Sequence, residues 1–156
     1  MQVMEELTDW SSDGRLLFGS WFEGARLSPD GKWLAFASDE SGNSEIYVQS
    51  FPAARGRWTV SSVSAPGRAS FPSWRSDNRE LFYLRGGQII AVPVTGDAGF
   101  SFGTPKILFG VSVTSASADY SISKDGQQIL TNELPPTDQS RIGARLILNW
   151  TSALTC

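Results

Sequence analysis

The chain has 156 residues and a net charge of −3 at pH 7, and 40% of its residues are hydrophobic. The acidic balance argues against nucleic acid as a partner, and no apolar run reaches the length that a membrane span requires. The absence of histidine excludes a Ser-His-Asp triad and a histidine-ligated metal. The single cysteine, Cys156, excludes an internal disulfide.

The first predicted element is a short hairpin over residues 7–20, which turns at Asp13 and Gly14. An Asp side chain caps a tight turn, and the Gly that follows tolerates the positive φ that such turns require. The acidic residues 1–6 lack the apolar core of a signal peptide. We expect the chain to be part of a larger protein.

Residues 23–62 predict an antiparallel unit of four short strands. Its first turn is at Asp30 and Gly31, and a polar loop over residues 38–43 leads to a strand rich in β-branched and aromatic residues. Pro52 ends that strand because proline cannot donate to a sheet ladder.

Residues 68–110 predict a second unit of the same kind. Asn78 follows the turn residue Asp77 in place of Gly, and Asn is the other residue that adopts the left-handed conformation at modest cost. The next turn, Arg-Gly-Gly at residues 85–87, is tighter than the matching loop of the first unit.

Residues 116–150 predict a third unit, which turns at Asp125 and Gly126. Its middle strands are joined by a Pro-containing loop at residues 133–143, of the kind that projects from a scaffold. This unit lacks an evident outer strand.

The four aspartate turns repeat one pattern. The spacing from Asp30 to Asp77 is 47 residues and from Asp77 to Asp125 is 48, whereas Asp13 precedes Asp30 by 17. A period near that length, with four short strands in each unit, is typical of β-propeller blades. The sequence therefore predicts an all-β fold, a β-propeller-like array of about three to three and a half antiparallel blades in an incomplete ring. The constant place of the aspartates makes them turn formers and not a ring of catalytic carboxylates.

The motifs of the common catalytic sites are missing from the sequence. It contains neither a Gly-x-Ser-x-Gly elbow nor a phosphate-binding Gly loop, and the kinase motifs are absent as well. The acidic residues 39–45 do not have the spacing of an EF-hand loop, so a solvated hairpin loop is the better interpretation. We therefore expect no catalysis by this chain, no cofactor and no metal site.

Binding is predicted in the loops that vary between the units. These loops cover residues 38–43, 85–87 and 133–143. The candidate binding residues are Ser38, Asp39, Glu40, Asn43, Arg85, Asp138 and Arg141. We expect an unidentified protein or small ligand as the partner. Of the tryptophans, Trp10 and Trp74 are assigned to the core and Trp58 and Trp150 to packing between blades, which leaves Trp21 free for function.

The repeat resembles a known family. Residues 25–38, Ala-Arg-Leu-Ser-Pro-Asp-Gly-Lys-Trp-Leu-Ala-Phe-Ala-Ser, followed by Ile-Tyr-Val at residues 46–48, resemble the WD-like repeat of TolB-type β-propellers. Residues 38–42, 47–52, 80–83 and 146–150 extend this likeness to the C-terminal propeller of certain bacterial serine/threonine protein kinases. The resemblance implies an appended sensor or interaction domain, in the bacterial cytoplasm or, for an anchored parent protein, the periplasm.

The expected function is a non-catalytic β-propeller scaffold for protein interaction or ligand sensing. The alternatives are the regulatory region of such a kinase, the gating propeller of a prolyl-oligopeptidase-like hydrolase, and a glycan-binding propeller that uses Trp21 or Trp58. An arc of blades exposes apolar faces at its ends, so we also expect the isolated chain to self-associate.

Overall fold

The structure, a computed structural model, describes residues 6–10, 16–19, 24–61, 66–96, 99–111, 120–133 and 143–148. In these residues the chain forms strands and turns and no helix, which confirms the all-β prediction. The described residues accordingly contain no helix long and apolar enough to cross a membrane.

The strands form four antiparallel sheets in chain order. A hairpin consists of β1 (Glu6–Trp10) and β2 (Leu16–Gly19). Blade 1 consists of β3 (Arg26–Leu27), β4 (Trp33–Ser38), β5 (Glu45–Ser50) and β6 (Arg57–Thr59). Blade 2 consists of β7 (Ala69–Trp74), β8 (Glu80–Arg85) and β9 (Gln88–Thr95), with β10 (Ser101–Phe102) and β11 (Lys106–Gly110) both paired to β9. Blade 3 consists, in its described part, of β12 (Tyr120–Ile122), β13 (Gln128–Glu133) and β14 (Gly143–Leu148).

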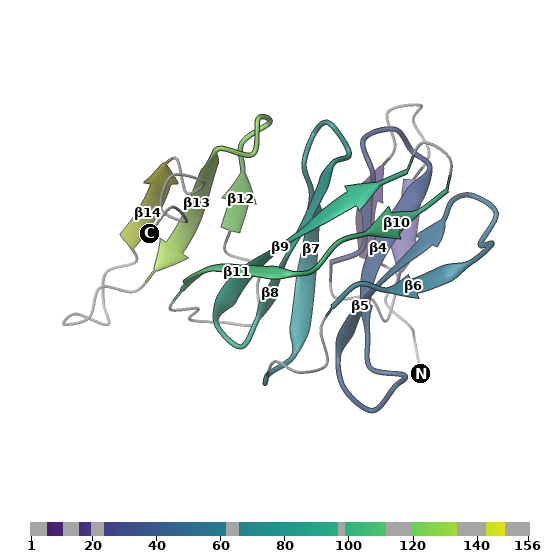
Figure 1. Ribbon diagram of the computed structural model, residues 1–156, viewed down its shortest axis with the longest axis horizontal. Helices are drawn as coiled ribbons and strands as arrows, with labels where there is room; N and C mark the ends of the chain where they lie inside the picture. The colour runs from purple at the N-terminus through teal and green to yellow at the C-terminus, as the bar shows by residue number, and fades with distance from the viewer. Residues whose placement is uncertain are drawn as a thin grey trace.

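The blades stand side by side in an open row, and the described sheets do not close into a ring (Figure 1). The aspartate turns join β3 to β4, β7 to β8 and β12 to β13, and all three lie at the upper edge in Figure 1. The turns that join β4 to β5 and β8 to β9 lie at the opposite edge. The two sets of turns therefore face different sides of the molecule.

The turn between β3 and β4 shows why the repeated sequence forms a hairpin. Gly31 N donates to Ser28 O at 2.8 Å, and Lys32 N donates to Asp30 Oδ1 at 3.2 Å. Gly31 has a φ of +70°, a conformation that glycine adopts without steric cost. The equivalent bonds of the next two turns are Asn78 N to Arg75 O at 3.1 Å, Arg79 N to Asp77 Oδ1 at 3.1 Å, Gly126 N to Ser123 O at 2.9 Å and Gln127 N to Asp125 Oδ1 at 3.0 Å. In each of these turns the aspartate carboxylate closes the loop.

The main core lies between blades 1 and 2. Ala35 and Ala37 of β4 belong to one buried cluster with Leu81 and Tyr83 of β8. The intervening residues of β4 are also buried, because the other face of blade 1 packs its own apolar cluster. Burial of each large apolar side chain contributes about 1.5–3 kcal/mol. Because both faces of such a strand are buried, its sequence is a continuous run of apolar residues.

A second core lies between blades 2 and 3. Phe82 of β8 and Ile129 of β13 are fully buried in it, and Tyr120 packs at its margin. The Tyr120 hydroxyl donates to Phe71 O of β7, and burial raises the pKa of Tyr120. Phe71 has a φ of +54° at a register shift between β7 and β8.

Candidate functional site

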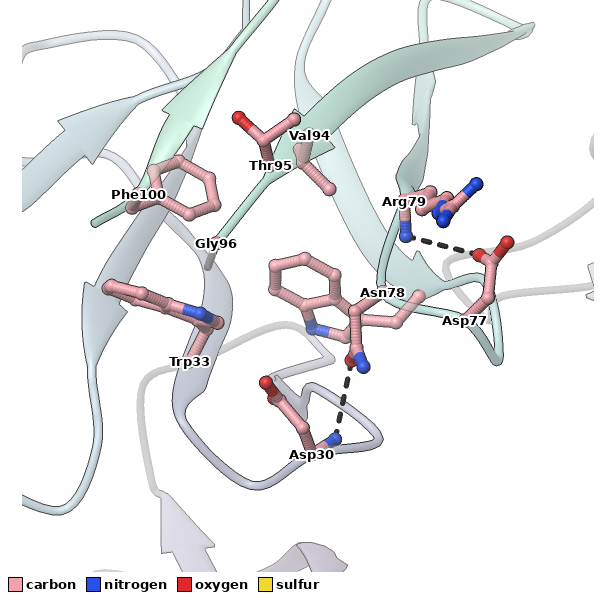
Figure 2. A pocket seen from close by; sticks show the side chains of 10 residues that line it. Asp30, Trp33, Asp77, Asn78, Arg79, Val94, Thr95, Gly96 and Phe100 are labelled. Carbon is pink, nitrogen blue, oxygen red and sulfur yellow. Dashed lines mark hydrogen bonds between the residues drawn. The ribbon is translucent and has the colours of Figure 1, made fainter. Parts of the chain in front are cut away.

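A cavity of about 450 Å³ lies at the aspartate-turn edge, where blade 1 meets blade 2 (Figure 2). Both blades contribute turn residues to it, β4 and β7 each contribute a tryptophan, and the rest come from the end of β9 and the segment before β10. The lining residues are Asp30, Trp33, Trp74, Asp77, Asn78, Arg79, Val94, Thr95, Gly96 and Phe100. Its volume falls within the range of small-molecule sites, about 300–1,000 Å³.

Two aspartate turns form the polar rim of the cavity. Asp30 N donates to Asn78 Oδ1 at 3.3 Å, so the turn of blade 1 is bonded directly to the turn of blade 2 (Figure 2). Asn78 has a φ of +59°, the left-handed conformation that brings its amide to this position. Because the amide oxygen is the atom engaged by Asp30, the amide nitrogen of Asn78 is the group of that side chain that can donate to a ligand.

Each carboxylate at the rim has a cationic partner. Asp77 Oδ2 lies 2.8 Å from Arg75 Nη2, and Asp30 Oδ2 lies 3.7 Å from Lys32 Nζ. The first oxygen of each carboxylate is engaged in its own turn, as described above. The local charges of the two turns are therefore balanced.

Aromatic side chains form the wall of the cavity. Trp33 packs against Trp58, at a ring separation of 5.7 Å and an angle of 78°, and against Phe100, at 5.2 Å. Trp58 and Phe100 also lie 5.2 Å apart, so the three rings form one cluster. Trp74 donates its Nε1 hydrogen to Arg26 O of blade 1 at 3.0 Å. Trp33 Nε1 is buried and has no hydrogen-bond acceptor among the described residues. The two lining indoles thus differ in their hydrogen bonding within the described part of the chain.

Gly96 lies close to the indole nitrogen of Trp33. A Cβ atom at residue 96 would lie 2.8 Å from Trp33 Nε1, which is closer than Cβ atoms come to other heavy atoms in proteins. Gly96 does not have a positive φ, so the requirement for glycine comes from space and not from backbone conformation. The segment that follows β9 therefore reaches the Trp33 edge because residue 96 has no side chain.

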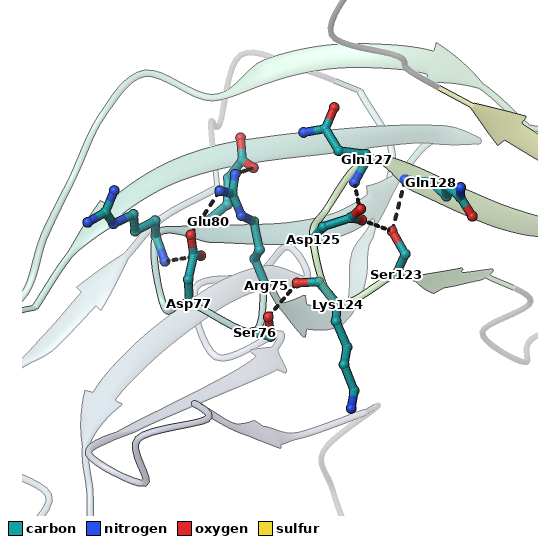
Figure 3. A network of polar contacts seen from close by, with 10 residues as sticks. Arg75, Ser76, Asp77, Glu80, Ser123, Lys124, Asp125, Gln127 and Gln128 are labelled. Carbon is teal, nitrogen blue, oxygen red and sulfur yellow. Dashed lines mark hydrogen bonds and ion pairs between the residues drawn. The ribbon is translucent and has the colours of Figure 1, made fainter.

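The junction of blades 2 and 3 is polar at the same edge (Figure 3). The Ser76 hydroxyl donates to Lys124 O, and Arg75 Nη1 lies 3.1 Å from Glu80 Oε2. Asp125 accepts from the Ser123 hydroxyl at 2.5 Å, and this bond, with the Gln127 N–H, lowers the pKa of Asp125. Hydrogen bonds therefore join the aspartate turn of each blade to the aspartate turn of the next.

The loop predicted to bind a partner lies at the opposite edge from the cavity. Asp39, Glu40 and Asn43 are exposed in the turn between β4 and β5, and Ser38 is half-buried at the end of β4. Glu40 Oε1 pairs with Arg57 Nη1 at 2.7 Å. The structure does not bring these residues into the cavity.

The predicted position of Arg85 in an exposed binding loop is wrong. Its side chain is 3% exposed and belongs to β8, and it pairs with Glu45 of β5 at 2.8 Å. The strand continues one residue further than the Arg-Gly-Gly sequence indicates, and Arg85 faces blade 1 together with Leu81 and Tyr83. A buried carboxylate from the neighbouring blade compensates the charge.

The remaining predicted residues lie outside the described part of the chain. These are the candidate binding residues Asp138 and Arg141, the turn residues Asp13 and Gly14, and the tryptophans Trp21 and Trp150.

Sequence reasoning missed Trp33, Gly96 and Phe100. The column of Trp33, three residues after the turn aspartate, contains Leu16, Glu80 and Gln128 in the other copies, so no repeated pattern distinguishes it. The contact with Gly96 joins residues of different blades. Local sequence carries no signal for such a contact.

No family model matches the chain, and neither does any curated protein. Among solved structures, the chain is similar to TolB from Acinetobacter baumannii, with a TM-score of 0.60 and 19% identity over 88% of this chain and 33% of that one. It is also similar to an oligogalacturonate lyase from Vibrio parahaemolyticus, with a TM-score of 0.50 and 15% identity over 94% of this chain and 39% of that one. The chain therefore spans well under half the length of each of these two proteins. Identities of this size show the fold, which is a TolB-like β-propeller with an unclosed ring.

Proposed function

We propose that the chain is part of a β-propeller binding module, a non-catalytic scaffold that senses or holds a ligand at the junction of two blades. The observation that carries the proposal is the cavity between blades 1 and 2, where two turns and an aromatic wall surround a buried N–H without an acceptor among the described residues. Convergent polar groups in an apolar hollow are the usual composition of a ligand site.

The composition of the rim supports binding over catalysis. Asp30 and Asp77 each use one carboxylate oxygen to close a turn and have a cation near the other. A general base needs a carboxylate that is free to take a proton from a substrate. The rim carboxylates are instead engaged in closing their own turns.

A ligand panel tests the proposal. The purified chain is heated with standard amino acids, dipeptides, short organic acids and hexoses, and the unfolding temperature is measured for each mixture. We expect at least one class to raise the unfolding temperature, because a ligand that binds the folded state stabilises it by mass action. We expect Gly96→Ala to abolish that shift and Trp58→Phe to retain it, since Trp58 does not line the cavity. A panel without any hit, or with hits that Gly96→Ala leaves intact, would contradict the proposal.

The association with a kinase or a hydrolase stays a prediction from the sequence. The reading frame upstream of this chain in its parent gene tests both. A kinase domain there would make the module a regulatory region, and an α/β-hydrolase domain in the same frame would make it a gating propeller.

A further inference from the structure

We propose that the cavity between blades 1 and 2 binds one ring of a neutral saccharide, an inference that rests on the function proposed above. Three properties of the lining support it, namely its available donors, its balanced charges and its apolar wall.

The hydrogen-bond donors available at the cavity favour a ligand with oxygen acceptors. A buried N–H without a partner costs about 1–3 kcal/mol, and Trp33 Nε1 is such a group among the described residues. The Asn78 amide lies on the same cavity with its oxygen engaged by Asp30 N. A ligand oxygen near Trp33 would satisfy the indole, and a second would accept from the Asn78 nitrogen.

The balanced charges at the rim favour a neutral ligand. Each rim carboxylate is paired, Asp77 with Arg75 and Asp30 with Lys32, so an incoming cation meets no uncompensated carboxylate at these two turns. Arg79 also lines the cavity, so an incoming anion meets a cation as well as the two carboxylates. The charged residues at and beside the two turns sum to zero and favour an ion of neither sign; they are Asp30, Asp77 and Glu80 against Lys32, Arg75 and Arg79. A hydroxyl suits this rim, because it accepts from an N–H and donates to a carboxylate without bringing charge.

The wall calls for a ligand with an apolar face. Trp74 has its N–H engaged by Arg26 O, so it offers carbon surface to the cavity, together with Val94 and Phe100. A pyranose ring has a face of C–H groups and a rim of hydroxyls. That pairing of an apolar face with donors and acceptors at its edge matches the lining, and the cavity of about 450 Å³ accommodates a ring of that size.

The test uses sugars that share one ring and differ in charge. Glucose, glucuronate and glucosamine form one set, and galactose, galacturonate and galactosamine form another. Binding to the purified chain is measured by saturation-transfer NMR and by calorimetry. We expect a neutral member of at least one set to bind. Its acid and amine counterparts should bind about tenfold more weakly, because each brings a charge to a rim whose own charges already balance.

Three variants locate the binding. Trp33→Phe keeps an aromatic ring and removes the N–H, and Gly96→Ala places a carbon 2.8 Å from that nitrogen. We expect both to weaken sugar binding by about five- to tenfold. Trp58→Phe removes an indole from the same aromatic cluster without touching the cavity, and we expect it to bind sugar like the parent chain. Circular dichroism checks that each variant is folded. If Trp33→Phe does not fold, the comparison of Gly96→Ala with the parent chain is the test.

The outcomes separate this inference from the proposed function. Binding of glucuronate or glucosamine that equals or exceeds that of glucose overturns the saccharide inference, as does Gly96→Ala with unchanged sugar affinity. Binding of an amino acid or dipeptide, abolished in Gly96→Ala while no neutral sugar binds, overturns the saccharide inference and supports the binding module. A folded chain that binds no probe of any class overturns both.

Discussion

Arg85 of β8 and Glu45 of β5 form a bidentate ion pair across the junction of blades 1 and 2. The distances are 2.8 Å from Nη1 to Oε2 and 2.9 Å from Nη2 to Oε1, and the side chains are 3% and 2% exposed. The hydrogen bond to Glu45 raises the pKa of Arg85, so the guanidinium stays charged inside the core. Glu45 also accepts a hydrogen bond from the Ser61 hydroxyl.

Removing one partner of this ion pair should strongly destabilise the fold. We expect Arg85→Met to lower the free energy of unfolding by about 3–5 kcal/mol, because it leaves the Glu45 carboxylate buried without its cation. Urea denaturation measures the decrease. The double variant Glu45→Met/Arg85→Met should recover most of it, since no buried charge is left uncompensated.

An exposed pair on the same blade provides the control. Glu40 and Arg57 are in contact at 2.7 Å, but their side chains are 53% and 35% exposed. Glu40→Gln should change the free energy of unfolding by less than about 1 kcal/mol. Equal decreases for Glu40→Gln and Arg85→Met would show that burial does not set the strength of the Arg85 pair.

Asn78 combines a backbone requirement with a contact between blades. Asn78→Ala should cost about 1–2 kcal/mol, because alanine tolerates the φ of +59° poorly and cannot accept from Asp30 N. Asn78→Gly keeps the conformation and removes the bond, so it should cost less than about 1 kcal/mol. Thermal and urea unfolding compare the two. Equal costs in the two variants would contradict this prediction, because they would mean that loss of the contact between turns, which both variants share, dominates over backbone strain.

Ser123 should control the acid sensitivity of the third turn. Its hydroxyl donates to Asp125 and is the leading cause of the lowered pKa of that carboxyl. A carboxyl with a lowered pKa stabilises the fold above its unfolded-state pKa, and this contribution is lost as the pH falls through the folded-state pKa. Ser123→Ala should therefore raise the Asp125 pKa toward its ordinary value, as followed by NMR titration of the carboxyl carbon. An unchanged titration would assign the shift to the Gln127 N–H instead.

Self-association of the isolated chain is expected from its open ends. Leu130 of β13 is 45% exposed in the last described sheet of the row. Leu130→Lys should lower the mass of the chain measured by light scattering, because a charge opposes the packing of apolar faces. Ile107→Lys is the control, since Ile107 is 52% exposed but lies on the outer strand β11 of blade 2. A monomeric parent chain would contradict the prediction, and an equal effect of both variants would show that the face of β13 is not the contact.

The strands and turns were predictable because their causes are local. Asp30 with Gly31 and Asp77 with Asn78 combine a capping carboxylate with a residue that accepts positive φ, and those pairs form the observed turns. The period of the turns predicts the blades by the same logic. Fold class therefore follows from short segments of sequence.

The candidate cavity was not predictable because its causes are contacts between blades. Trp33 and Gly96 are 63 positions apart by residue number and meet where one blade packs on the next. Arg85 was assigned to a loop for the same reason, since its partner Glu45 is 40 residues away. Variable loops are a sound guide to binding sites in general, yet the described loops at residues 38–43 and 85–87 lie at the opposite edge from the cavity.

The polar contacts between blades also determine how the chain should lose amide protection. Trp74 with Arg26 and Ser76 with Lys124 are each 48 residues apart, so each contact joins a blade to its immediate neighbour. Such an array opens by nearest-neighbour steps, and an end unit can detach while the others stay closed. Amides of β13 should then exchange with solvent through openings that leave β4 and β8 protected. A ligand held between blades 1 and 2 would slow amide exchange in those two blades. It would leave the exchange of β13 amides unchanged, because blade 3 detaches without opening the ligand site. The exchange rate of blade 3 is therefore an internal reference for ligand binding between blades 1 and 2.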